Sequence, residues 1–238
     1  MKNKAAKIWC VVPAAGVGSR FGEKRPKQYL PFRASTIIDV TIERLSACQE
    51  IEKIIVCTHP DDSFSSQSSY VDNPKVEVTA GGLKRADSVL NGIHFIKQQA
   101  DDNDWVLVHD AVRPCVSLSD IEKLINTTLQ TDVGGILAKP IHNTVKDVNG
   151  ALVTKTLDRS SLWHALTPQI FKLVDLEKAL LAAKKIDAII TDEASAIEQI
   201  GIKVQIVEGR SDNIKVTVPS DLALANFYIN QQEQSECE

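Results

Sequence analysis

The chain has 238 residues, of which 43% are hydrophobic and 24% charged, a composition typical of a globular protein and not of a disordered segment. Its length favours a single domain over residues 1–238. The formal net charge of −4 argues against nucleic acid as a partner, so a phosphate site would need a local group of cations.

Strand-like apolar runs alternate with helical patterns through the first half of the chain. Residues 8–12 read as a buried strand that leads into a glycine-rich loop. Further strands are predicted at 54–58, 76–79 and 105–109, and helices at 37–48, 86–96 and 120–129, the last with Ser119 as its N-cap. The alternation predicts an α/β fold with a doubly wound, mostly parallel, Rossmann-like sheet that binds ligands at the carboxyl ends of its strands.

The pattern changes after residue 136. Residues 144–148 and 152–157 suit two strands, and Asn149-Gly150 between them is a strong hairpin signal. A two-stranded arm, about residues 139–160, is marginal alone and must pack against something, unless it is an ordinary edge hairpin of the main sheet. The remaining predicted elements are helices at 175–185 and 192–200, strands at 203–207 and 214–218, and a last helix from Pro219.

The loop after the first predicted strand carries the strongest chemical signal. Its glycines let backbone amides approach a ligand closely, and cations follow at once: Arg20, Lys24, Arg25 and Lys27. This combination suits a polyphosphate. However, the P-loop pattern needs Gly-Lys-Ser/Thr where Gly22-Glu23 stands, and the dinucleotide fingerprint needs a glycine in place of Phe21. A plain glycine turn between a strand and a helix is the alternative interpretation.

Two more loops follow predicted strands and would lie at the same edge of the sheet. In residues 80–89, two glycines would admit a base or ribose, and cations and Ser88 follow. In residues 109–114, Asp110 could bind a ribose hydroxyl or a magnesium ion. Taken alone, the first loop is equally well a strand-to-helix turn, and His109 is better explained as structural. Their shared edge predicts a single site.

Residues 13–28 resemble the signature of sugar-nucleotide pyrophosphorylases and cytidylyltransferases, in which Ala-Ala-Gly-x-Gly-x-Arg is followed by Pro-Lys-Gln. The resemblance is closest to the isoprenoid-pathway family that uses 2-C-methyl-D-erythritol 4-phosphate. Other strings similar to this family occur in family order between residues 11 and 225: 81–89, 109–114, 144–146, 157–159, 162–169, 191–195 and 208–217. Val112 and Asn143 replace an alanine and an aspartate of the family pattern.

The resemblance implies a single nucleotidyltransferase domain that joins the CMP moiety of CTP to 2-C-methyl-D-erythritol 4-phosphate and releases pyrophosphate. The alternatives are a ribitol 5-phosphate cytidylyltransferase, a nicotinamide-dependent oxidoreductase and a nucleotide-binding regulator without catalysis. The resemblance also implies that the arm builds a homodimer and that Mg²⁺ bridges the triphosphate and touches Asp110.

The same resemblance assigns roles to individual residues. Arg20 and Lys27 would be catalytic. CTP would be bound by Pro13, Ala14, Ala15, Gly16, Gly18, Gly81, Gly82, Arg85, Ser88, Asp110 and Ala111. The polyol phosphate would be bound by Arg113, Thr144, Arg159, Thr167, Thr191 and Lys215. Taken singly, Thr191 or Asp192 suits a helix cap and Trp163 suits the core.

The cysteines and the N-terminus bear on the compartment. Five cysteines, without a Cys-x-x-Cys pair, indicate neither a disulfide framework nor a zinc site and favour a reducing cytoplasm. Basic residues before an apolar run are typical of a secretory signal, but Pro13, Gly16 and Gly18 interrupt this run, so we expect no signal peptide. No apolar segment reaches membrane-spanning length, so we expect no membrane partner.

Overall fold

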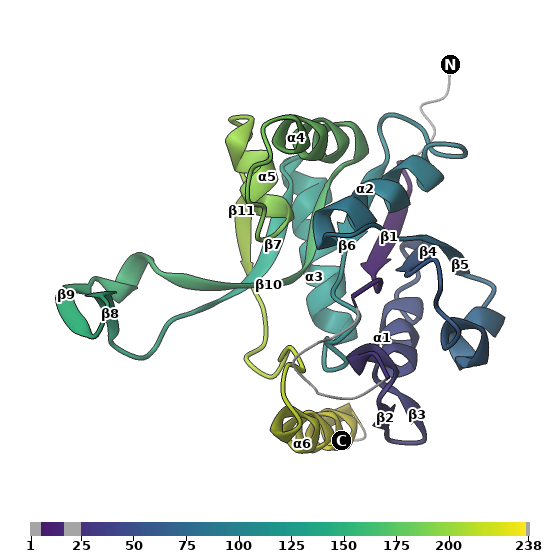
Figure 1. Ribbon diagram of the computed structural model, residues 1–238, viewed down its shortest axis with the longest axis horizontal. Coiled ribbons are helices and arrows are strands. Elements are labelled where there is room, and N and C mark those ends of the chain that lie inside the picture. Colours follow the sequence, from purple (N-terminus) through teal and green to yellow (C-terminus); the bar gives the residue numbers. More distant parts are fainter. Residues whose placement is uncertain (1–5, 17–24, 237–238) are drawn as a thin grey trace.

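A seven-stranded sheet forms the centre of the computed structural model, which describes residues 6–16 and 25–236 (Figure 1). Its strands, in spatial order, are β11 (Gln205–Glu208), β7 (Gly135–Pro140), β10 (Trp163–Lys172), β6 (Trp105–Val108), β1 (Ile8–Pro13), β4 (Ile51–Thr58) and β5 (Val76–Ala80). Neighbouring strands are parallel, except that β10 runs antiparallel to both β6 and β7. The prediction of a mostly parallel α/β sheet is therefore confirmed.

Helices cover both faces of this sheet. They are α1 (Ile37–Ser46), α2 (Arg85–Ile96), α3 (Leu118–Thr131), α4 (Leu173–Lys185), α5 (Glu193–Gln199) and α6 (Ser220–Glu236). Side chains of β1 alternate between the faces, as in any strand. Cys10 and Val12 belong to a buried cluster with α1 and α3, whereas Trp9 and Val11 belong to one with α2, α4 and α5. A strand buried on both faces reads as a continuous apolar run, which is why residues 8–12 were recognisable.

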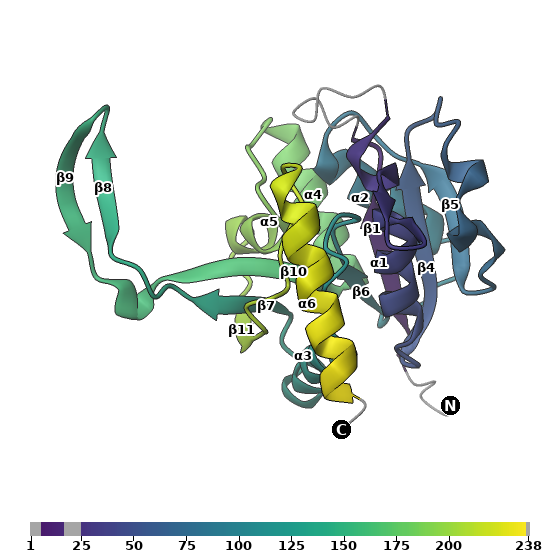
Figure 2. The ribbon, with the colours of Figure 1, turned by 90° about the horizontal axis from the view of Figure 1, so that it is seen from below.

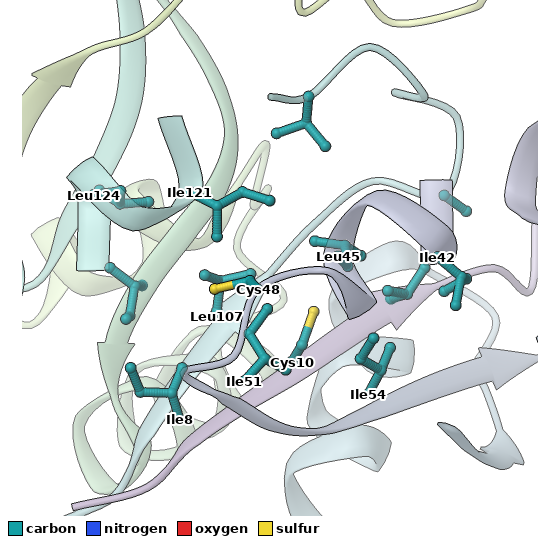
Figure 3. Close-up of a cluster of buried hydrophobic side chains, with 14 of the residues drawn as sticks. Ile8, Cys10, Ile42, Leu45, Cys48, Ile51, Ile54, Leu107, Ile121 and Leu124 are labelled. Carbon is teal, nitrogen blue, oxygen red and sulfur yellow. The ribbon is translucent and has the colours of Figure 1, made fainter. Parts of the chain in front are cut away.

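Close packing fills the first of these clusters. In Figure 3, Cys10 of β1 lies among Ile42 and Leu45 of α1 and Ile54 of β4. A third cluster joins α6 to a short ribbon, β2 (Pro31–Phe32) and β3 (Ser35–Thr36), and to the segments after β6 and β11. The C-terminal helix thus covers loops that lead to the carboxyl edge of the sheet.

The helix ends follow the capping rules. Asp192 caps α5, because its side chain accepts a hydrogen bond from the backbone N–H of Ser195, as its sequence position suggested. The prediction for α3 was wrong by two residues. The cap is Ser117 and not Ser119, since Ser117 has extended backbone angles and its hydroxyl accepts from the N–H of Asp120.

Two predictions about strands were also wrong. Residues 214–218 form no strand, because they run beside the loop after β6 and make a single backbone hydrogen bond there, from Val216 N to Val112 O at 2.8 Å. Conversely, no strand was predicted at residues 163–172, where β10 lies between β6 and β7. Trp163 is not core either, since it stands at the outer end of β10 and is 36% exposed.

The predicted hairpin forms a separate two-stranded arm. It consists of β8 (Val145–Asn149) and β9 (Leu152–Leu157), and Figures 1 and 2 show it projecting well away from the body. It is therefore not an edge hairpin of the main sheet. Gly150 in the turn has φ of 59°, a left-handed conformation that glycine adopts without strain. Apolar side chains on the arm are exposed, with Val148 at 55%, Leu152 at 76% and Val153 at 59%.

Two further observations concern membranes and thiols. None of the helices in the described ranges is long and apolar enough to cross a bilayer. Four cysteines fall in these ranges, and all four are buried and free of disulfides. Burial raises the pKa of the Cys57 thiol to about 12, so this thiol is unreactive at neutral pH.

Candidate active site

The loops after β1, β5 and β6 meet at the carboxyl edge of the sheet and line one cleft of about 490 Å³. Small residues and cations predominate among its lining residues: Pro13, Ala14, Ala15, Gly16, Lys27, Gln28, Gly82, Leu83, Lys84, Arg85, Ser88, Asp110, Ala111, Val112, Lys215 and Thr217. The structure thus brings together most residues that the sequence singled out for a nucleotide. Gly18 and Arg20, also singled out, lie outside the described residues.

Gln28 fixes the end of the first loop. It is buried within a 3₁₀ turn (Lys27–Tyr29), and its Nε2 donates to the carbonyls of Ala14 at 2.7 Å and Gly16 at 3.1 Å. These two bonds tie the turn to the loop that follows β1. The turn therefore places the neighbouring Lys27 among the residues that line the cleft.

Gly81 sets how closely the first two loops approach. A Cβ at this position would come within 2.6 Å of the Ala15 Cβ and 2.9 Å of the Ser88 Oγ, both closer than real Cβ contacts. Only glycine therefore fits between them. Gly81 lies behind the lining of the cleft, whereas Gly82 lines it and donates its N–H to Ser88 Oγ at 3.0 Å.

Three cations surround the carboxylate of Asp110, which lines the cleft. Its Oδ1 accepts from Arg85 Nε at 2.9 Å, and its Oδ2 lies 3.3 Å from Arg113 Nε and 3.0 Å from Lys215 Nζ. Burial acts to raise the pKa of this carboxyl, but the three cations outweigh it and hold the pKa well below its usual range. Asp110 is consequently ionised at any physiological pH.

Glu193 holds Arg85 from the other side. This fully buried carboxylate accepts a hydrogen bond from each terminal nitrogen of Arg85, at 2.6 and 3.0 Å, in a bidentate pair. Burial acts to lower the pKa of Arg85, yet Glu193 and Asp110 together raise it above its ordinary value. Because three cations face two carboxylates here, the cluster retains positive charge for an anionic ligand.

A second, smaller hollow of about 230 Å³ adjoins the first and shares Arg85, Asp110 and Lys215 with it. Four residues that the resemblance assigned to the polyol phosphate line this hollow: Arg113, Thr167, Thr191 and Lys215. The other two do not. Thr144 is exposed just before β8, and Arg159 lies in a 3₁₀ turn (Arg159–Ser161) after β9, where its guanidinium donates to the His142 carbonyl.

His109 is a buried structural residue, as favoured from the sequence. Its Nδ1 lies 3.1 Å from Thr167 Oγ1 and its Nε2 lies 3.2 Å from the Arg113 carbonyl. A carbonyl only accepts, so Nε2 carries the proton and Nδ1 accepts from the threonine hydroxyl. Burial lowers the pKa of His109 to about 4, which keeps the ring neutral at pH 7. The backbone N–H of Asp110 also donates to Thr167 Oγ1 at 3.1 Å, so His109 and Asp110 connect the loop after β6 to Thr167 on β10.

Asp110 does not fit as a ligand of Mg²⁺. Both of its oxygens already accept from cations, and the same three cations would repel a divalent ion. No cluster of three or more metal-ligating side chains occurs within residues 6–16 and 25–236. Magnesium that accompanies a nucleotide would have to be held mainly by the phosphates, as is common for this ion.

Gln28, Gln169 and Glu193 have site contacts to which sequence reasoning gave no role. Gln169, on β10, donates to Asp192 at 2.9 Å and accepts from the N–H of Ala194 at 2.9 Å, and so fixes the start of α5. All three residues stand within strings that resemble the family. The signal was therefore present, but their partners are distant in sequence and become visible only in the fold.

Comparisons with known proteins agree with this geometry. The sequence pattern of the family described as 2-C-methyl-D-erythritol 4-phosphate cytidylyltransferase matches residues 8–231. Proteins of that name are 47% identical in Photobacterium profundum, over 94% of this chain and 97% of that protein, and 47% identical in Vibrio atlanticus, over 98% and 100%. The crystal structure of the Francisella tularensis protein of that name has a TM-score of 0.81 and 38% identity, over 94% of this chain and 100% of that one.

Proposed function

Because the chain belongs to the 2-C-methyl-D-erythritol 4-phosphate cytidylyltransferase family, we propose that its two adjoining hollows bind CTP and 2-C-methyl-D-erythritol 4-phosphate. The chain is a nucleotidyltransferase of isoprenoid biosynthesis, and the products are 4-diphosphocytidyl-2-C-methyl-D-erythritol and pyrophosphate. One observation carries the placement of both substrates. The cluster of Arg85, Asp110 and Lys215 borders both hollows, so two anionic substrates meet at one set of cations.

CTP occupies the larger hollow in this proposal. The backbone of residues 13–16 and of Gly82 approaches the nucleotide, and Ser88 supplies a hydroxyl. Lys27, which lines this hollow, stabilises the negative charge that develops on the α-phosphate, and the family resemblance assigns the same role to Arg20, which lies outside the described residues. Catalysis is then mainly positioning and charge stabilisation, as in phosphoryl transfer generally.

The polyol phosphate occupies the smaller hollow, where Arg113 and Lys215 hold its phosphate and Thr167 and Thr191 offer hydroxyls. A phosphate oxygen attacks the α-phosphorus of CTP in line, the bond from that phosphorus to the β-phosphate bridge breaks, and pyrophosphate leaves. The attacking phosphate monoester is already anionic at neutral pH, so no general base is needed. The neutral, fully hydrogen-bonded His109 fits this scheme.

The proposal also includes a metal ion, a homodimer and a cellular compartment. Mg²⁺ comes with CTP and is bound by its phosphates, since Asp110 is a poor ligand for it. The arm forms a homodimer and brings Thr144 and Arg159 to the partner's smaller hollow, because neither residue borders either of these two hollows in the described part of its own chain. The cysteines are free and buried, which favours a reducing compartment such as the cytoplasm.

Pyrophosphate release from CTP tests the function directly and separates it from the ribitol 5-phosphate alternative. We expect a kcat/KM for 2-C-methyl-D-erythritol 4-phosphate at least about 100-fold above that for ribitol 5-phosphate, because a fitted polar site rejects analogues that leave its groups unpaired. CTP should likewise be preferred over UTP. Equal kcat/KM for the two polyol phosphates, or release only with ribitol 5-phosphate, would refute the proposed substrate.

A further inference from the structure

Asn213 lies where three segments that build the smaller hollow meet. Its side chain is 1% exposed, and its Nδ2 donates to the backbone carbonyl of Thr167 on β10 at 2.8 Å. Its own backbone carbonyl accepts from Arg113 Nη1 at 2.9 Å. Asn213 borders neither hollow, so it does not touch a ligand there. It joins β10, the loop after β6 and the segment that carries Lys215.

The segment that carries Lys215 depends on such anchors. Residues 213–217 belong to no helix or strand, so no ladder of backbone hydrogen bonds fixes their position. The bond from Val216 N to Val112 O ties the far side of Lys215, and the Asn213 side chain ties the near side. Lys215 Nζ then reaches Asp110 Oδ2 at 3.0 Å. These bonds on either side of Lys215 help to fix the place of this cation, together with the bonds from Thr217 to Asp221 at 2.8 and 2.9 Å.

Asparagine at this position carries a cost. Its Oδ1 is buried and has no hydrogen-bond partner among the residues that the structure describes. A buried acceptor without a partner is destabilising, and an apolar residue of the same shape would avoid that penalty. The benefit must therefore lie in the bond from Nδ2 to Thr167, which also holds the backbone carbonyl that accepts from Arg113 in place.

We propose that Asn213 is a positioning residue for the polyol phosphate, because it fixes Thr167, Arg113 and Lys215 relative to one another. This inference rests on the proposed function, in which these three residues bind that substrate. Asp110 also contacts all three residues, but it borders both hollows, whereas the two bonds of Asn213 go to Thr167 and Arg113, which border only the smaller one. Loss of the anchor loosens the smaller hollow. Among the residues that line the larger hollow it affects Lys215, while Gln28 and Gly81 keep the loops after β1 and β5 in place around CTP.

The test compares Asn213→Leu, which keeps the branched arrangement of heavy atoms but removes the donor, with Asn73→Leu as a matched control. Asn73 also donates its side-chain amide, to Ser46 Oγ at 2.9 Å, but it lies before β5 and away from both hollows. For Asn213→Leu we expect the KM for the polyol phosphate to rise about tenfold, kcat to fall, and the Kd of CTP alone to stay within about threefold of wild type. Asn73→Leu should change none of these.

The outcomes separate this inference from the proposed function. A wild-type protein that releases no pyrophosphate from CTP with either polyol phosphate refutes the function itself. An active wild type, with an unchanged polyol KM in folded Asn213→Leu, refutes the role of Asn213. An equal loss of CTP affinity also refutes it, since the effect would then be general. Asn213→Ser, which is too short to reach Thr167, gives the same comparison if the leucine variant does not fold.

Discussion

At the scale of single residues, the site is organised by charge. Asp110 draws three cations together, and Glu193 binds the terminal nitrogens of Arg85, whose Nε bonds Asp110. Two buried carboxylates thus hold three like charges at close range and neutralise only part of their charge. Such a cluster suits a site where two phosphorylated substrates must approach each other.

Lys27 is expected to act on the reaction more than on binding. Lys27→Ala should lower the single-turnover rate on the order of 100- to 1000-fold, because a stabiliser of developing negative charge is lost, while the Kd of CTP changes much less. Rapid-quench kinetics and calorimetric titration of CTP measure the two effects separately. Lys178→Ala, an exposed lysine on α4, is the matched control and should leave both unchanged. A single-turnover rate for Lys27→Ala within about threefold of wild type would contradict the catalytic role.

His109 predicts a pH dependence of stability. Its pKa in the folded protein, about 4, lies below the ordinary value near 6.5, so the unfolded chain binds more protons between these two values. The free energy of unfolding is therefore full above about pH 6.5 and falls as the pH drops toward 4. Burial of the neutral ring is the cause.

The sensitive comparison is urea denaturation at pH 7.5 and pH 5 for wild type and His109→Gln. We expect the wild type to lose more stability than the variant over this interval, by up to about 2 kcal/mol from the size of the pKa shift. His94→Gln, at an exposed histidine on α2, should behave like the wild type. Identical losses in the wild type and His109→Gln would show that another group causes the pH dependence.

At the scale of elements, regular periodicity was the reliable guide. The strands buried on both faces and the amphipathic helices were recognisable, because neighbours in sequence determine those patterns. The same holds for the loops of the site, which follow such strands. The failures occurred where tertiary contacts decide. Residues 214–218 look like a strand, but their neighbour is a loop, and β10 is a strand only because β6 and β7 lie on either side.

The site shows the same division. Asp110 could be singled out because it ends a predicted strand, and Arg85 because it follows a glycine turn after another predicted strand. The contact between these two residues could not be predicted, because they are 25 residues apart in sequence. The pairing of Arg85 with Glu193 could not be predicted either, because it spans 108 residues. Neither could the place of Thr144 and Arg159 be predicted by local pattern. They belong to the arm, whose position depends on what it packs against.

At the scale of the whole molecule, the arm is the feature that the isolated chain leaves unexplained. A hairpin that projects from the body with exposed Val148, Leu152 and Val153 is marginally stable unless these side chains are covered (Figure 2). A second copy of the chain, related by a twofold axis, would cover both arms at once. Each smaller hollow would then receive Arg159 from the other subunit.

Subunit mixing tests this arrangement. If Arg159 acts across the axis, Lys27→Ala and Arg159→Ala are each nearly inactive as pure dimers, because every site then lacks either the stabiliser of the developing charge or a phosphate-binding arginine. A mixed dimer has one site with both defects and one with neither. Random exchange should therefore restore about one quarter of the wild-type activity. Mixing Lys27→Ala with Arg113→Ala is the control, since both defects lie in the body and each mixed site keeps one of them. If exchange is confirmed by mass spectrometry and the first mixture stays as inactive as the control, Arg159 serves its own chain and the shared site is wrong.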